Sequence, residues 1–426
     1  MTGEQLEHAY LQELEARAIM PKGFSAGVTS LSFVPQERPT QAAYKMNLST
    51  LFCTKPTGSI AGVFTQNAFP GAPVIIAREK LTRKRAQGFL VNNKIANVSS
   101  ARGVHDATKI TQTFADHLSL DPQDIFPVST GIIGWGLPVS DIEAALPALA
   151  KNVQSSSLLP FAKGIMTTDS FPKLRRSSLG SGSLVGVAKG AGMIEPNLAT
   201  MLVFLVTDVS FPPDLGQRVL ARVVDRTFNC ISVDSDQSTS DMVMLLGSDH
   251  YGPVNEQQLE VALTEVCQEL AEDIVRNGEG TSHILAVEVD GRSNDKEARS
   301  IGKAVVNSPL VKTAMYGNDP NVGRILSSMG NYLGNAGLGA DMTRLEISLG
   351  EEVVFHQGTF KLDKEKESRI SDYLASRAMN PTVKGYPQPH DRVEIKVHFH
   401  QGPGRARVLG SDLSYEYVRE NADYRS

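Results

Sequence analysis

Short apolar runs recur along the chain and predict buried β-strands. Each run is brief, rich in apolar and often β-branched residues, and has glycine or polar residues nearby, which is the pattern of a strand. The runs cover residues 62–64, 72–76, 183–188, 201–206, 242–246 and 284–289.

Segments with the residue spacing of helices lie between several of these runs. Apolar residues recur three and four positions apart over 257–276, which predicts a long amphipathic helix. A shorter helix is expected over 141–146, interrupted at Pro147 because proline lacks the N–H that a helix interior needs. Leu6, Tyr10 and Leu14 predict an N-terminal helix that ends near Pro21. The mixture favours an α/β or α+β fold whose sheets are covered by helices.

Composition narrows the classes of partner. Lys+Arg number 42 against 47 for Asp+Glu, so the net charge is -5 and no basic field is available to hold nucleic acid. No stretch approaches the roughly 18 apolar residues that span a bilayer, so we expect a soluble, cytoplasmic protein without a membrane partner. Cys53, Cys230 and Cys267 form no C-x-x-C pair, so buried thiols are favoured over a disulfide framework or a zinc site.

The segment 187–208 is the most unusual part of the sequence. Gly190 and Gly192 permit backbone geometry closed to other residues, and Pro196 prevents a continuing helix. Thr200 then opens an apolar strand. A hydroxyl at that point suits an attack on the preceding carbonyl, that of Ala199. An N-to-O acyl shift followed by hydrolysis would leave two chains and a new N-terminal threonine.

An N-terminal threonine is a useful nucleophile because its own α-amine can serve as the base. The pKa of that amine is about 8 in model peptides, close to working pH. From spacing alone, however, the favoured interpretation is simpler: Thr200 is a β-branched residue that opens a core strand, since glycine-rich turns before strands are common.

Several blocks, in order, resemble the ornithine acetyltransferase family, also called bifunctional glutamate N-acetyltransferase, of arginine biosynthesis. The resemblance covers nearly the whole chain from Gly23 onward. It implies an α/β fold of α-β-β-α sandwich type, with two β-sheets layered between helices. It further implies a chain that cuts itself into segments 23–199 and 200–426, after a helical extension over 1–22. The blocks are 61–67, 129–134, 165–169, 189–208, 226–229, 233–241, 278–280, 306–313 and 421–426.

The resemblance assigns roles residue by residue. Thr200 matches the autocatalytic nucleophile, with cleavage after Ala199, and Thr130 with Gly131 matches the oxyanion hole. Without the resemblance, simpler interpretations are favoured. The 130–131 stretch would be an ordinary turn, Glu279 would be a loop carboxylate and Lys189 would be a surface lysine. The residues matching substrate-binding positions are Thr167, Thr168, Lys189, Thr200, Glu279, Asn421 and Ser426.

The implied reaction is a ping-pong acetyl transfer through an acyl-threonine. The donor would be N-acetylornithine and the acceptor glutamate, with no metal, nucleotide or coenzyme. Two cleaved units would assemble into a heterotetramer. Three alternatives stay open: an N-acyl-amino-acid hydrolase or amidase that uses water as acceptor, a member retuned to an unusual amino acid of a specialised pathway, and a binding protein that no longer cuts.

The chain departs from the family pattern at several positions. His283 stands where lysine is usual, Glu420 where an apolar residue is usual, and Val322 where tryptophan is usual. Trp135 follows the oxyanion turn. Because His283 and Trp135 adjoin matched site residues, we expect that both could lie near the pocket and alter substrate choice.

Overall fold

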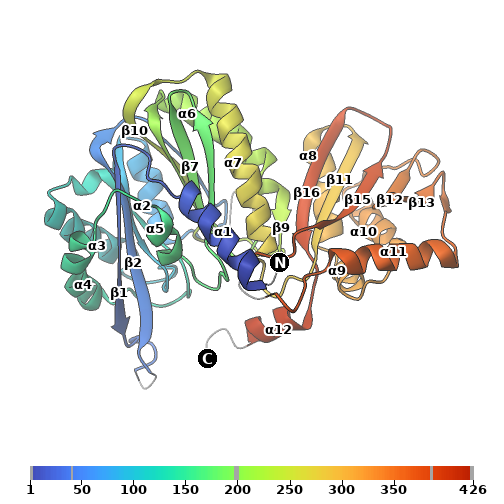
Figure 1. Cartoon of the computed structure of the whole chain (residues 1–426), viewed down its shortest axis with the longest axis horizontal. Helices are drawn as coiled ribbons and strands as arrows, with labels where there is room; N and C mark the ends of the chain where they lie inside the picture. The colour runs from blue at the N-terminus through green and yellow to red at the C-terminus, as the bar shows by residue number, and fades with distance from the viewer. Residues whose placement is uncertain (1–2, 40–41, 196–200, 384–386, 423–426) are drawn as a thin grey trace.

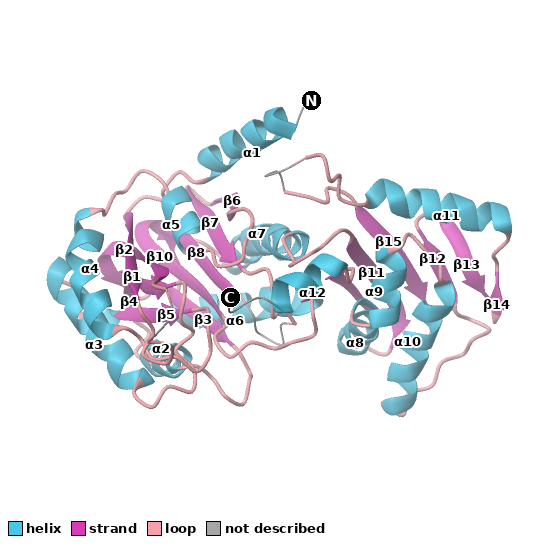
Figure 2. Cartoon of the chain, turned by 90° about the horizontal axis from the view of Figure 1, so that it is seen from below, coloured by secondary structure: helices cyan, strands magenta, loops and turns pink. Residues whose placement is uncertain are grey.

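The computed structural model describes residues 3–39, 42–195, 201–383 and 387–422, and its strands form three sheets. Figure 1 shows two sheets stacked in one half of the molecule and the third sheet in the other half, and Figure 2 gives the same division from below. The predicted two-sheet architecture is therefore right for one half and wrong for the whole chain.

The first sheet has the order β1-β2-β4-β5 and the second the order β3-β10-β8-β7-β6. In the first sheet β4 and β5 are parallel, while β10 and β8 are the parallel pair of the second. The strands are β1 (Phe24–Phe33), β2 (Tyr44–Thr57), β3 (Ile60–Phe64), β4 (Ala86–Asn92), β5 (Ile125–Ser129), β6 (Lys173–Leu179), β7 (Gly182–Lys189), β8 (Leu202–Ser210) and β10 (Met242–Pro253).

A buried apolar layer joins these two sheets face to face. The rings of Phe89 on β4 and Phe204 on β8 meet edge-on with centroids 5.1 Å apart. Helices cover the outer faces, as the sandwich prediction requires: α3 and α4 pack on the first sheet, and α6 and α7 pack on the second. The helices of this half are α1 (Gly3–Arg17), α2 (Ala72–Leu81), α3 (Gly103–Leu118), α4 (Val139–Lys151), α5 (Leu159–Gly164), α6 (Pro213–Arg226) and α7 (Glu256–Arg276).

The third sheet has the order β14-β13-β12-β15-β11-β16-β9 and its own apolar core beneath the C-terminal helices. Its strands are β9 (Ile231–Ser232), β11 (Ile284–Arg292), β12 (Glu346–Leu349), β13 (Glu352–His356), β14 (Thr359–Phe360), β15 (Arg392–His398) and β16 (Gly404–Ser411). The helices are α8 (Asp295–Val306), α9 (Pro309–Tyr316), α10 (Val322–Asn335), α11 (Lys364–Arg377) and α12 (Tyr415–Ala422).

Two local predictions were wrong. Residues 72–76 form the first turn of α2 instead of a strand, because Pro73 at the helix start suits the helical φ and a short apolar run does not fix the period. Pro147 lies inside α4 instead of interrupting it. Leu146 and Leu149 are buried beside it, so their packing holds the helix across the missing hydrogen bond.

The other predicted strands correspond to β3, β7, β8, β10 and β11, and α7 confirms the long helix. The N-terminal helix α1 ends at Arg17, earlier than expected, and packs through Tyr10, whose hydroxyl donates to the Pro172 carbonyl at 3.1 Å. All three cysteines are free and buried. No helix within the described ranges is long and apolar enough to cross a membrane.

Candidate active site

A cavity of about 240 Å³ lies at one end of the two stacked sheets. The chain enters it after β5 and after β7, and again where β8 and β10 begin. All the predicted site residues that the structure describes line this one cavity, although they are far apart in sequence. They are Thr130, Gly131, Thr167, Thr168, Lys189, Glu279 and Asn421.

The turn after β5 presents two potential donors to the cavity. Gly131 has φ +124°, and a Cβ there would lie 2.2 Å from the Lys94 carbonyl oxygen, so glycine is required. The Thr130 N–H is used by the Asn92 carbonyl at 3.2 Å. The N–H of Gly131, by contrast, has no acceptor within the described part of the chain. The geometry leaves the Gly131 N–H and the Thr130 hydroxyl as the pair that can meet an oxyanion.

Lys189, the last residue of β7, reaches the Thr130 hydroxyl. Its Nζ donates to Thr130 Oγ1 at 2.9 Å. Since the ammonium is a donor only, the hydroxyl accepts here and keeps its own proton for another acceptor. Burial lowers the pKa of Lys189, and the nearby carboxylates of Asp169, Asp241 and Glu279 partly offset that effect.

Glu279 collects three segments of the chain at the other side of the cavity. Its carboxylate accepts from Thr168 Oγ1 at 2.8 Å and from Asn421 Nδ2 at 2.9 Å. Its N–H donates to the Ala191 carbonyl at 2.9 Å. A Cβ on Gly192 would lie 2.4 Å from Glu279 Oε2, so the absence of a side chain there permits the close approach.

Two acidic residues of this region carried no predicted role. Asp241 lines the cavity and is buried, and Asp169 lies directly behind it. Both belong to blocks that carry the family resemblance, 165–169 and 233–241, and both are acidic residues beside hydroxyl-rich stretches. An acidic residue beside hydroxyl-rich stretches, within a block that resembles the family, was the sequence feature that could have indicated a role for Asp169 and Asp241.

The residues that depart from the family pattern divide into two groups. His283 is 1% exposed, lies between Asp412 Oδ2 at 2.8 Å and the Leu374 carbonyl at 3.2 Å, and does not line the cavity. Trp135 packs edge-on against Tyr44 in the core behind the first sheet. Both residues were expected near the pocket, and neither side chain lines the cavity, because both point into the packed interior. Glu420 is different: its pKa is raised by partial burial and by the Glu279 carboxylate.

The predicted nucleophile lies outside the described residues, as do Ala199 and Ser426. The residues that follow Thr200 are described, and Met201 and Leu202 both line the cavity. The strand that Thr200 was predicted to open therefore begins at the cavity wall.

The cavity brings together the Lys189 amine, carboxylates, hydroxyls and the Gly131 N–H, and such convergent polar groups are typical of an enzyme active site. The chain belongs to the ArgJ family, whose model matches residues 38–426. It is 35% identical over 405 residues to the "Arginine biosynthesis bifunctional protein ArgJ 2" of Nostoc sp., covering 95% of this chain and 97% of that one. The family resemblance is thereby confirmed.

Two further proteins are similar to this chain. The "Glutamate N-acetyltransferase Oat2" of Streptomyces clavuligerus is 35% identical, with 88% of this chain and 92% of that protein covered. A crystal structure of the arginine biosynthesis bifunctional protein ArgJ from Bacillus halodurans is 34% identical and covers 53% of this chain and 100% of its own, with a TM-score of 0.46.

Proposed function

We propose that this protein is a glutamate N-acetyltransferase of the ornithine acetyltransferase type, which moves an acetyl group from N-acetylornithine to glutamate. The observation that carries the proposal is the convergence of Thr130, Gly131, Lys189, Glu279 and Asn421 on one cavity in a chain of the ArgJ family. Position-by-position matches in sequence would have little meaning if the fold scattered them.

The first step of the proposal is self-cleavage. The Thr200 hydroxyl attacks the Ala199 carbonyl, and the C–N bond breaks as the ester forms, which frees the Thr200 α-amine. Water then hydrolyses the ester, so that the C–O bond breaks, the Ala199 carboxylate is released and the Thr200 hydroxyl is restored. The two segments would stay together, because β7 and β8 pair along their length from Leu184 opposite Thr207 to Lys189 opposite Leu202. Self-association of two cleaved units also belongs to the proposal.

Acetyl transfer then follows in two halves. Thr200 Oγ gives its proton to the α-amine and attacks the acetyl carbonyl, with the oxyanion facing Thr130 and Gly131. The C–N bond of the donor breaks, and the leaving ornithine amine takes the proton. The glutamate amine next attacks the acetyl ester, the C–O bond breaks, and the threonine hydroxyl is restored.

The direct test supplies N-acetylornithine with and without glutamate and measures N-acetylglutamate, ornithine and acetate by mass spectrometry. N-acetylglutamate formed in step with ornithine is the expected result. Acetate release without glutamate would identify the hydrolase instead. No turnover of N-acetylornithine, together with transfer from another N-acetylated amino acid, would identify a retuned member.

We expect Glu279→Gln to lower kcat/KM for N-acetylornithine by roughly 10- to 100-fold, mainly through KM. The change preserves shape but removes the charge that accepts from Thr168 and Asn421, and hydrogen bonds to charged groups are worth about 1.5–3 kcal/mol. Glu269→Gln is the matched control, because that half-exposed carboxylate pairs with Arg175 at 3.3 Å and does not line the cavity. Equal kinetics for the two variants would contradict the role of Glu279.

A further inference from the structure

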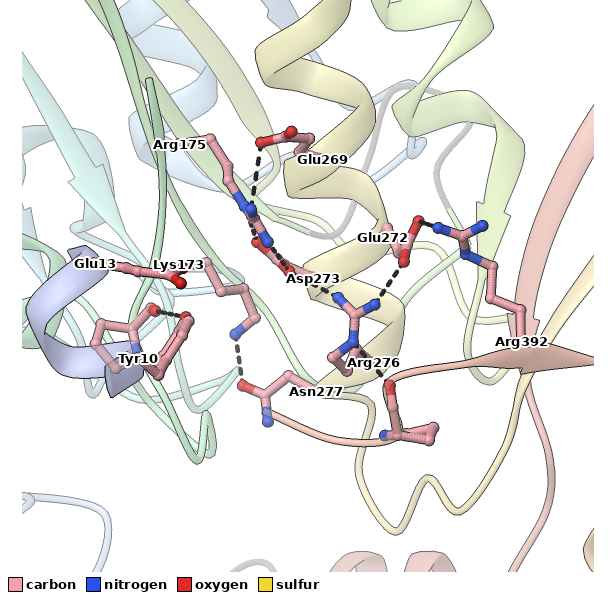
Figure 3. A network of polar contacts seen from close by, with 12 residues as sticks. Tyr10, Glu13, Lys173, Arg175, Glu269, Glu272, Asp273, Arg276, Asn277 and Arg392 are labelled. Atoms are coloured by element: carbon pink, nitrogen blue, oxygen red, sulfur yellow. Dashed lines mark hydrogen bonds and ion pairs between the residues drawn. The ribbon is translucent and has the colours of Figure 1, made fainter. Parts of the chain in front are cut away.

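Two buried charges lie behind the cavity without lining it. Asp169 and Lys173 form an ion pair of 2.5 Å, and both side chains are 0% exposed. Lys173 Nζ also donates to Asn277 Oδ1 at 2.6 Å, a contact visible in Figure 3. A buried pair is costly to desolvate and is weak evidence for stability, so its placement calls for another explanation.

Asp169 ties together the two turns that carry site residues. Its Oδ1 accepts from the Gly190 N–H at 2.7 Å, directly after Lys189. Its Oδ2 accepts from the Thr167 N–H at 3.0 Å. One carboxylate thus fixes the end of β7 and the 167–168 turn, both of which line the cavity through neighbouring residues.

Asp169 interacts electrostatically with both Lys173 and Lys189. Burial alone would raise the pKa of the Asp169 carboxyl, but Lys173, Lys189 and the Gly190 N–H hold it well below its usual range. Burial is the main cause that lowers the pKa of Lys189, and Lys173 lowers it further as a like charge. Asp169, Asp241 and Glu279 act in the opposite direction.

We infer that Asp169 is a positioning residue of the oxyanion site, which acts through the Lys189–Gly190 turn to hold the Lys189 ammonium on Thr130. With Lys189 donating to Oγ1 at 2.9 Å, the Thr130 proton is left for the developing oxyanion. Lys189 therefore serves the oxyanion hole besides any contact with substrate. The inference rests on the proposed acyl transfer, and it goes further by naming what sets the donor.

Two substitutions test this with opposite signs. In Asp169→Asn the pKa of Lys189 falls, because burial and Lys173 are then opposed by fewer carboxylates. Lys189 loses its proton at lower pH, so the alkaline limb of the kcat profile moves to lower pH, and kcat falls roughly 10- to 100-fold with KM little changed. In Lys173→Met a like charge is removed, the pKa of Lys189 rises, and the alkaline limb moves to higher pH.

Asp208→Asn is the control, since this buried carboxylate also accepts backbone N–H groups, of Ser183 at 2.7 Å and Lys22 at 3.2 Å, away from the cavity. The alkaline limb of the kcat profile of Asp208→Asn should coincide with that of the wild-type protein. Intact mass gives the cleaved fraction of each variant, and rates are expressed per cleaved chain. If Asp169→Asn does not fold, the direction of the Lys173→Met shift decides.

Rates are measured with p-nitrophenyl acetate as well as with N-acetylornithine. Wild-type activity on the ester alone would refute the proposed donor but leave the inference on Asp169 testable by the same profiles. Alkaline limbs that coincide with wild type in both Asp169→Asn and Lys173→Met would overturn the inference, because a purely structural role moves neither.

Discussion

Thr200→Ala is expected to yield one uncut chain of 46.1 kDa and no acetyl transfer, whereas the wild-type protein yields two fragments that meet between Ala199 and Thr200. The substitution removes the hydroxyl that the proposed mechanism uses as nucleophile twice, first on the Ala199 carbonyl and then on the acetyl donor. Loss of a covalent nucleophile typically lowers kcat on the order of 10⁴-fold or more. Intact mass spectrometry and the transfer assay measure the two effects on the same sample.

Thr200→Ser is the informative companion, because it keeps a hydroxyl and should cut and transfer, at a lower rate. Cleavage at the same bond in Thr200→Ala would place the nucleophile elsewhere. Transfer by an uncut wild-type chain would remove the α-amine as the base, since that amine exists only after the Ala199–Thr200 bond breaks.

The residues that line the cavity were predicted from sequence better than the buried residues that hold them in place. The fold brings together at one cavity four residues that lie in blocks resembling the family: Thr130, Lys189, Glu279 and Asn421. Those roles came from resemblance, since a Ser-Thr-Gly turn or a lone Glu in a glycine-flanked loop fits many structures. Helical periodicity predicted α7, and short apolar runs predicted the strands β7, β8, β10 and β11.

What sequence could not supply is partnership between distant residues. Nothing in the sequence near Lys173 indicates that its ammonium is fully buried against Asp169 and Asn277, since a lysine in a polar stretch predicts a surface position. His283 and Trp135 adjoin site residues in sequence but do not line the cavity, because neighbours in sequence can point to opposite sides of the backbone. The third sheet was missed because strands such as β12 and β13 are too short to give a clear period.

Gly131→Ala should be the most damaging small substitution in the described part of the site. Two costs combine there: φ of +124° is unfavourable for a residue with a Cβ, and that Cβ would lie 2.2 Å from the Lys94 carbonyl oxygen. The backbone must move, which displaces the Gly131 N–H from the oxyanion position. We expect kcat to fall on the order of 100-fold or more, the range for loss of one oxyanion donor.

Gly134→Ala separates the two costs, because Gly134 also has a positive φ, +89°, but a Cβ there meets nothing within 4 Å. Strain alone should lower the free energy of unfolding by about 1–3 kcal/mol and leave kcat near wild type. Thermal unfolding and kcat, measured for both variants, give the comparison. If Gly131→Ala loses stability but retains wild-type kcat, its N–H is not an oxyanion donor, and the Thr130 hydroxyl is the remaining donor of the proposed pair.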